Sequence, residues 1–314
     1  MTTVEYAEYR ALNENTVVDY VRAIPALAAL FEPSDTITAS EVGDGNLNLV
    51  FKLYAKEDQV TVYGDEMWYK QSYGNSKVYG TPGNTALMKR PFGQNDTIYI
   101  MADTLYTIND TINNIRQLHA YYEVLIYSNG LQGKCDSLVY DYNDSTITMF
   151  EDPLLWNQGN QISAENIQTY ISNNNVDSMR LTTRSFVVQK DTSGNYNQIK
   201  GRDMLAHFKE QEITRLDVNG NGETLYFLVE QDTITMGLNR VECSEMSMIF
   251  GDSSELETMT FRNQVDAKFI PIHEILEPER RLKDFRLRFD ERPEKAILVA
   301  RKKLIASTEE EEEG

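Results

Sequence analysis

A glycine-rich loop at residues 43–46 has residue types that could handle phosphate. It consists of Gly43, Asp44, Gly45 and Asn46, inside the stretch "VGDGNLNLVF". Glycines let backbone amides approach a phosphate closely, so such a loop could cradle a nucleotide. Phosphoryl transfer also requires a catalytic base and acids that hold the metal ion. The chain has 3 histidines, and none precedes an aspartate at catalytic-loop spacing, so we expect a vestigial nucleotide loop in a chain that is not an enzyme.

A second motif, "DVNGNG" (217–222), has oxygen donors like those of a calcium loop. Asp217, Asn219, Asn221 and Gly222 stand at the offsets of its first half, but Leu228 takes the twelfth position in place of the bidentate glutamate. Asn-Gly pairs favour tight hairpin turns. We therefore expect a hairpin turn at this motif, and neither a metal ion nor a cofactor elsewhere in the chain.

The charge of the chain argues against one class of partner. The 314 residues carry a formal net charge of −19. Such a charge disfavours binding to nucleic acid. The glutamate run within 307–314 is expected to form a disordered acidic tail. The two cysteines, Cys135 and Cys243, belong to no CxxC pair, and the sequence leaves open whether they pair with each other.

The elements that would position these residues begin with a short helical segment. Apolar residues between 15 and 31 follow helical spacing, and residues 36–55 read as strand, glycine turn and strand. We therefore predict a short α+β segment over residues 1–57. The apolar run at 24–31 is far shorter than the ~20 residues of a membrane span, and acids precede it, so we expect neither a span nor a signal peptide.

Residues 58–262 repeat one unit, in which a small residue or Cys is followed by an acid, an alternating stretch and an aromatic residue. Examples are "YGDEMWY" (63–69) and "GKCDSLVY" (133–140). Polar turns such as "DYND", "SNNN", "KEQ" and "GDSS" separate the unit from a second strand with period-2 alternation. We expect the repeated acids to begin strands or turns and to accept hydrogen bonds from backbone amides. These acids are Asp65, Asp103, Asp136, Glu165, Asp203 and Glu245.

This pattern predicts a mainly β protein of repeated antiparallel hairpins. A lone hairpin is marginal in water, so the hairpins must stack over a shared apolar face. A one-residue shift in register would turn every side chain to the other face. The candidates for the apolar face are Met67, Tyr69, Leu105, Leu138, Tyr140, Ile147, Met149, Ile167, Met179, Leu181, Leu205, Met246, Met248 and Met259.

The stretch "YRALNENTVVDYV…IPALAALF…EVGDGNLNLVFKL" resembles the N-terminus of methylthioribose kinase, a sugar kinase with a protein-kinase-like fold. The resemblance covers residues 5 to 53, and the loop at 43–46 matches the glycine-rich loop of that family. The catalytic loop and the metal-binding acid that the family carries further on have no counterpart here. An inactive kinase fragment is therefore one alternative interpretation of the chain.

A longer ordered series includes "VYGDEMWYKQSYGNSKVYGTP", "LQGKCDSLVYDYNDSTITMFEDPLLWNQGNQISAENIQTYI" and "NQIKGRDMLAHFKEQEITRLDVNGNGETLYFL". It resembles the OstA-like proteins of Bacteroidota, of the periplasmic LptA/OstA-type lipopolysaccharide-transport family. The resemblance implies an elongated antiparallel β-jelly roll, or β-taco, whose two sheets enclose an apolar groove for the acyl chains of lipopolysaccharide. The candidate residues would then line this groove. Exposed strand edges would pair with other lipopolysaccharide-transport proteins.

Together the resemblances divide the chain into four parts. Residues 1–57 form a kinase-N-lobe-like fragment, 58–262 the OstA-like β-repeat domain, 263–306 a cap across the end of the sheet, and 307–314 the acidic tail. The join near 52–60 indicates a chimera, of which the sequence leaves the origin open. The longer resemblance predicts the periplasm, whereas the chain as given would stay in the cytoplasm. A β-repeat scaffold without a ligand remains a further alternative to lipid binding.

Overall fold

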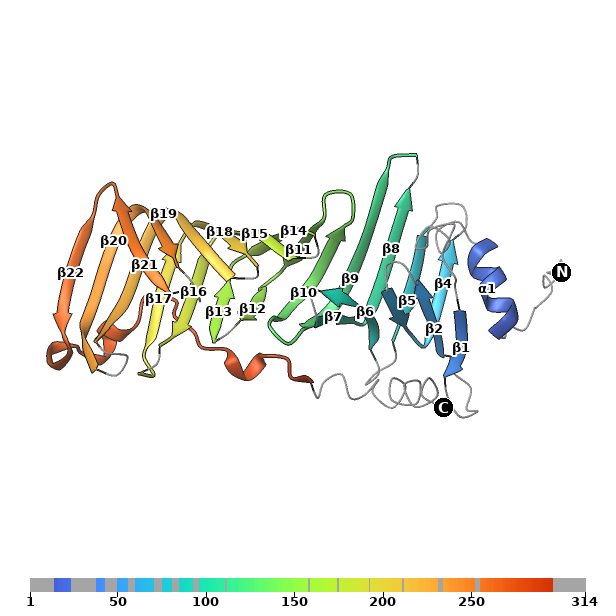
Figure 1. Cartoon of the computed structure of the whole chain (residues 1–314), viewed down its shortest axis with the longest axis horizontal. Coiled ribbons are helices and arrows are strands. Elements are labelled where there is room, and N and C mark those ends of the chain that lie inside the picture. Colours follow the sequence, from blue (N-terminus) through green and yellow to red (C-terminus); the bar gives the residue numbers. More distant parts are fainter. Residues whose placement is uncertain are drawn as a thin grey trace, which may run out of the picture.

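The computed structural model is an elongated molecule whose strands lie side by side along its long axis (Figure 1). Helix α1 (Glu14–Ala23) lies at one end and the last strand, β22 (Asp266–Pro271), at the other. The structure describes residues 14–23, 38–42, 50–55, 60–70, 75–80, 85–92, 96–110, 112–157, 159–173, 175–191, 193–210, 212–230, 234–251 and 255–295.

The strands form one antiparallel sheet that is folded over into two layers, as the predicted fold class requires. Among the described residues, 22 strands belong to it. Four long strands run through both layers: β9 (Ile115–Tyr127), β10 (Gln132–Asp141), β19 (Glu212–Glu230) and β20 (Ile234–Phe250). Layer A adds β1 (Thr38–Val42), β2 (Val50–Ala55), β3 (Val60–Tyr63), β6 (Ala86–Phe92), β7 (Asp96–Ala102), β12 (Leu154–Asn157), β13 (Asn160–Ser163), β16 (Ser185–Lys190), β17 (Tyr196–Gly201) and β22. Layer B adds β4 (Glu66–Lys70), β5 (Asn75–Tyr79), β8 (Thr104–Asp110), β11 (Thr146–Phe150), β14 (Asn166–Ser172), β15 (Asn175–Thr182), β18 (Asp203–Lys209) and β21 (Leu256–Arg262).

The repeated acids mark the crease, the line along which the sheet folds from layer A into layer B. At this line the backbone N–H of Asp103 donates to the carbonyl of Tyr122 at 3.3 Å, and that of Glu165 to the carbonyl of Thr183 at 2.9 Å. The carboxylate of Asp203 also accepts the N–H of Thr183 at 3.0 Å. The role expected for the acids, at strand starts and as acceptors of backbone amides, is confirmed at Asp203.

Strands that return from layer B to layer A turn the same corner through two consecutive residues with positive φ. Their φ values lie between 50° and 79°. Such a conformation costs about 1–3 kcal/mol for a residue other than glycine, so the surrounding ladder must hold it in place. The corner pairs are Tyr122–Glu123, Glu151–Asp152, Thr183–Arg184, Gly220–Asn221 and Asn263–Gln264.

The motif "DVNGNG" is one of these corners, which corrects the expectation of a hairpin turn there. Gly220 and Asn221 have φ values of 79° and 50°, and β19 continues on both sides of them. The positive φ that Asn-Gly favours is present, but it bends one strand instead of joining two. The other polar segments expected as turns, near 143, 173, 210 and 253, each lie between two paired strands of layer B.

The C-terminal part differs from the expected cap across the end of the sheet. β22 pairs with β20 from Gly237↔Pro271 to Glu242↔Asp266 and so completes layer A. Three short 3-10 helices follow, η2 (Ile272–Glu274), η3 (Glu277–Arg280) and η4 (Phe289–Glu291). Residues 272–295, called the strap below, run back along the molecule toward its middle (Figure 1). Their side chains pack on the outer face of layer A, because that face is apolar.

The N-terminal part contains the expected helix and hairpin, α1 and the paired strands β1 and β2. The pairs Leu53↔Val62 and Ala55↔Val60 join β2 to β3, so the boundary expected after residue 57 falls between two paired strands. The loop of Gly43, Asp44, Gly45 and Asn46 lies outside the described residues. Within the described part of the chain, no helix has both the length and the apolar character to cross a membrane.

Candidate functional site

One continuous apolar core fills the space between layers A and B. It extends from Val78 of β5 to Met246 and Met248 of β20. Alternate residues of each strand point into it, as period 2 requires. The interior is therefore shared by successive hairpins along the molecule and is not divided into separate blocks.

A cavity of about 150 Å³ lies in this interior. Ile162, Val187 and Ile199 line it from layer A, and Ala206 and Leu216 from layer B. An enclosed apolar cavity of roughly this size binds a molecule as large as benzene. The space as it stands therefore holds a segment of one alkyl chain, and a lipid with several chains requires the layers to part.

The cavity reaches the side of the molecule opposite the crease, which we call the mouth. Its lining includes Asn157 and Asn160, which flank the β12–β13 turn, and Phe250 and Leu256, which flank the β20–β21 turn. The layer A rim thus carries amides beside the apolar side chain of Leu131, and the layer B rim carries apolar side chains. Tyr226 also lines the cavity, and burial raises the pKa of its phenol, helped by the charge of Asp191.

Most of the predicted candidates that the structure describes do face this interior. Three of them, Met179, Leu181 and Met248, line the cavity. Leu205 is an exception, because it lies between Met204 and Ala206, which face inward, and so points out of layer B. The side chains of Met67 and Tyr69 are outside the described part of the structure. The remaining inward candidates are Leu105, Leu138, Tyr140, Ile147, Met149, Ile167, Met246 and Met259.

The sequence analysis missed the layer A half of the cavity. Ile162, Val187 and Ile199 are inward residues of strands that lie outside the acid-plus-aromatic unit. The alternation in these strands is hidden, because the outer face is apolar too. In β16, Phe186 and Val188 face outward on either side of Val187. A strand that is buried on both faces reads as an unbroken apolar run, and that run was the available signal.

The outer face of layer A forms a second apolar core with the strap. Leu282 of the strap packs with Phe186, Leu225 and Leu238, and Phe285 packs against the same cluster. The ring of Phe285 lies 6.4 Å from that of Phe186, centroid to centroid. The strap is therefore held first by burial of apolar surface.

Two buried glutamines of layer A bind the backbone of the strap. The amide of Gln198 donates to the carbonyl of Arg280 and accepts the N–H of Leu282, both at 2.8 Å. Gln161 does the same with the carbonyl of Arg286, at 2.8 Å, and the N–H of Arg288, at 2.7 Å. Each glutamine side chain thus makes the pair of hydrogen bonds that a neighbouring strand would make. It satisfies backbone N–H and C=O groups of the strap that would otherwise lie unpaired on an apolar face.

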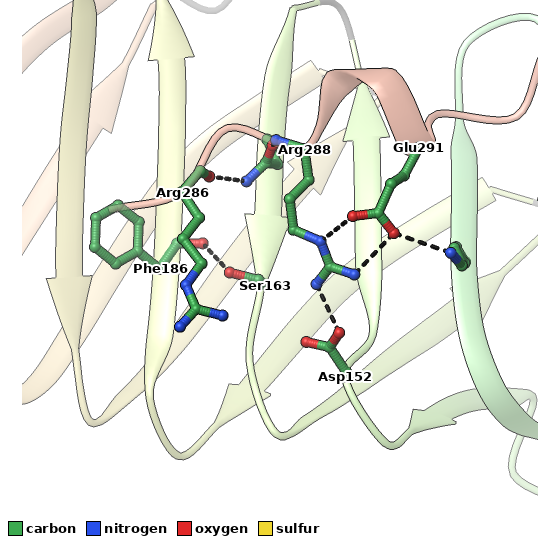
Figure 2. Close-up of polar contacts among 8 residues, drawn as sticks. Asp152, Ser163, Phe186, Arg286, Arg288 and Glu291 are labelled. Atoms are coloured by element: carbon green, nitrogen blue, oxygen red, sulfur yellow. Dashed lines mark hydrogen bonds and ion pairs between the residues drawn. The ribbon is translucent and has the colours of Figure 1, made fainter. Parts of the chain in front are cut away.

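Ion pairs complete the attachment of the strap, as Figure 2 shows for Arg288, Glu291 and Asp152. Arg288 contacts Asp152 at 2.6 Å, and Lys134 contacts Glu291 at 2.9 Å. Hydrogen bonds from Arg288 and Lys134 lower the pKa of Glu291 to about 2. The strap is thus tied by charge to β10 and to a corner of the crease.

The described residues have few groups that could do chemistry. No three His, Cys, Asp or Glu side chains among them gather as metal ligands. Cys135 and Cys243 are both free and buried. Burial raises the pKa of the Cys135 thiol to about 12, so this thiol stays protonated and is a poor nucleophile.

No protein-family model matches the chain, and the likenesses to known proteins include a kinase sequence and a solved structure. Methylthioribose kinase 1 of Oryza sativa subsp. japonica is 44% identical over 55 residues, which span 17% of this chain and only 13% of the kinase. The crystal structure of LptH from Pseudomonas aeruginosa, the LptA homologous periplasmic component of the lipopolysaccharide transport device, covers 45% of this chain and 95% of LptH. Its TM-score is 0.35 and its sequence identity 8%. The short kinase resemblance is thereby confirmed, and the fold assignment rests on the strand pairings themselves.

Proposed function

We propose that this chain is a non-enzymatic lipid-binding or bridging protein of the lipopolysaccharide-transport type. The observation that supports it most is the apolar cavity between two layers that are joined at the crease and meet at a mouth of hairpin turns. Binding of an acyl chain there needs no catalytic group, because each buried methylene contributes about 0.8 kcal/mol. The sequence resemblance to OstA-like proteins supports lipopolysaccharide, through its lipid A acyl chains, as the ligand.

The free edges of the sheet support a bridging role. Within the described residues, β21 and β22 each pair with β20 alone. Their other edges carry backbone groups to which a strand of another protein can add. We place other lipopolysaccharide-transport proteins at this end, and by the same resemblance we place the chain in the periplasm.

A variant that fills the cavity tests lipid binding directly. Ala206 is buried and lines the cavity, so Ala206→Leu puts three more carbon atoms into the space. The variant should bind a fluorescent lipid A analogue at least tenfold more weakly. Met179→Leu, a change of nearly equal volume in the same lining, should leave binding unchanged. Circular dichroism checks that both variants keep the β spectrum.

The two alternatives predict other outcomes. If the folded, unmodified protein shows no saturable lipid binding, a β-repeat scaffold explains the chain better. The kinase alternative rests on the 55-residue likeness, and it requires ATP-dependent phosphorylation of methylthioribose by the purified chain. We expect no such activity, because the likeness leaves out the catalytic loop that the kinase fold needs.

A further inference from the structure

Two arginines take inward positions at the mouth, beyond the cavity described above. Arg90 of β6 lies between the inward residues Met88 and Phe92, two positions from each. Arg116 of β9 precedes the inward residues Leu118 and Ala120 in the same alternation. Arg90 belongs to layer A and Arg116 to layer B, and each stands within a few residues of a hairpin turn. The two guanidinium groups are therefore presented at the mouth from the two opposite layers.

Two tyrosines connect the arginines across the interior. Arg90 donates a hydrogen bond from Nη1 to the phenol oxygen of Tyr140 at 2.9 Å. The ring centroid of Tyr140 lies 4.3 Å from that of Tyr142, and the guanidinium of Arg116 lies 5.1 Å from the Tyr142 centroid. The Nε atom of Arg116 is buried and has no hydrogen-bond partner among the described residues. A buried N–H of this kind is costly unless a ligand accepts from it.

This cluster is continuous with the apolar cavity. Phe92 lines the 150 Å³ cavity, and it also lines a second space of about 10 Å³ together with Arg90, Tyr140 and Ile147. A chain that enters the larger space therefore passes Phe92 on its way to the arginines. The second space is about large enough for a single water molecule, so a charged head would sit at the rim and not within it.

We propose that Arg90 and Arg116 bind the acidic head of an amphiphile whose alkyl chain occupies the cavity. Guanidinium groups match carboxylate and phosphate oxygens in charge and in geometry, and such charge-assisted hydrogen bonds are about twice as strong as neutral ones. In a chain of net charge −19, these two arginines place positive charge among the inward-facing side chains near the mouth. The inference rests on the proposed lipid binding and narrows its ligand class to amphiphiles with a carboxylate or phosphate head.

Three competitors with the same twelve-carbon chain provide the test on the full-length protein. The neutral fluorophore N-phenyl-1-naphthylamine reports occupation of the apolar cavity, and dodecanol, dodecanoate and dodecyl phosphate displace it. We expect the better acidic competitor to displace the fluorophore about tenfold more strongly than dodecanol, in line with charge-assisted hydrogen bonds. The ranking of dodecanoate and dodecyl phosphate then distinguishes a fatty-acid head from a phosphate head.

Arginine variants show whether the preference comes from this cluster. Arg116→Met and Arg90→Met should each lower the ratio of acid to alcohol at least threefold and leave displacement by dodecanol unchanged. Arg180→Met, which removes an exposed arginine of β15, is the matched control and should keep the ratio. If Arg90→Met fails to fold because Tyr140 loses its donor, Arg116→Met and the charge-keeping Arg90→Lys still decide the question.

The outcomes separate this inference from the proposed function. If the fluorophore binds and all three competitors displace it equally, the arginines do not select an acidic head, and only this inference is overturned. The same conclusion follows if the ratio survives in Arg116→Met and in Arg90→Met. If the fluorophore does not bind the folded protein at all, both the cavity function and this inference are overturned.

Discussion

The two surfaces of layer A are both apolar, yet they are covered in different ways. From β13 to β22 the outer surface is covered by the strap, which brings Leu282 and Phe285 onto the sheet and has its backbone bound by Gln161 and Gln198. The inner surface faces layer B and leaves a cavity of about 150 Å³. A single extended segment can follow the contour of a sheet residue by residue. Two sheets joined at a crease instead stay at a fixed distance from each other, so gaps can remain between them. The space for a ligand is thus on the side where sheet meets sheet.

Removal of the strap should lower the stability of the protein more than any other change below. It exposes the apolar outer surface of layer A and leaves the inner surface covered. Truncation after Pro271 exposes Phe186, Leu225 and Leu238 and deletes Leu282, and one such buried side chain alone is worth ~2–5 kcal/mol. We expect the urea midpoint of unfolding, followed by circular dichroism, to fall by more than any point variant achieves. Truncation after Ala306 is the control, because it removes only the glutamate-rich tail that the sequence predicts to be disordered, and it should leave the midpoint unchanged. Equal midpoints for both truncations would show that the outer surface needs no cover.

Loss of the Gln198 side chain should cause the next largest loss of stability. Gln198→Ala leaves the carbonyl of Arg280 and the N–H of Leu282 without their partner, and each unsatisfied buried group costs ~1–3 kcal/mol. Gln168→Ala is the matched change on the open outer face of layer B, where, among the described residues, the amide accepts a hydrogen bond from the hydroxyl of Tyr170. Urea unfolding should show a much smaller loss for this control. Similar losses would mean that the strap does not depend on its backbone contacts.

Low pH should weaken the attachment of the strap to layer A and leave the core between the two layers unchanged. Because Arg288 and Lys134 lower the pKa of Glu291 from 4.5 to about 2, its carboxylate stabilises the fold above pH 4.5, and this contribution is lost as the pH falls toward 2. Solvent screening limits it to ~1 kcal/mol. Glu291→Gln should therefore be less stable than the unmodified protein near neutral pH, with the difference closing near pH 2. A difference that stays constant down to that pH would contradict this assignment.

A change at the crease should have the smallest effect and leave both surfaces as they are. Thr183 has a φ of 61°, which is unfavourable for a β-branched residue and better tolerated by asparagine. Thr183→Asn should therefore raise the free energy of unfolding by ~0.5 kcal/mol. Thr182→Asn, one residue earlier within β15, should not stabilise, because asparagine is disfavoured in strands. Binding of N-phenyl-1-naphthylamine should be the same in both variants, and a gain in the control alone would argue against strain at the corner.

The sequence predicted layer B better than layer A, and the reason is physical. Layer B has one buried face, so Leu138, Met149 and Met179 appear in clean alternation and were placed inward correctly. Leu205 was misplaced because both it and its neighbour Met204 are apolar, and only the register decides between them. In layer A both faces are apolar, so Val187 and Phe186 could not be told apart by pattern alone.

The prediction for the strap had the largest error, because its contacts involve residues that are distant in the sequence. Its charges suggested a peripheral segment, but Leu282 and Phe285 lie on a core that is built from residues far away in the sequence. The glutamines that bind it are equally distant, and Gln198 looks in sequence like any polar strand residue. The repeated acids, by contrast, recur in one short pattern along the chain, and their expected role is seen at Asp203, whose carboxylate accepts the N–H of Thr183, 20 residues earlier.

Because the sheet folds along one crease, strand pairs follow one another along the long axis of the molecule. Among the described residues, each strand pairs with its hairpin neighbour or with a strand two corners away along the chain. Folding can therefore start at any hairpin and spread to the next one. An extra set of four strands, two in each layer, would lengthen the interior by two strand spacings, about 10 Å, without changing any other pair. Only the strap would have to grow to match. Duplication of such a four-strand set would therefore lengthen the groove in discrete steps.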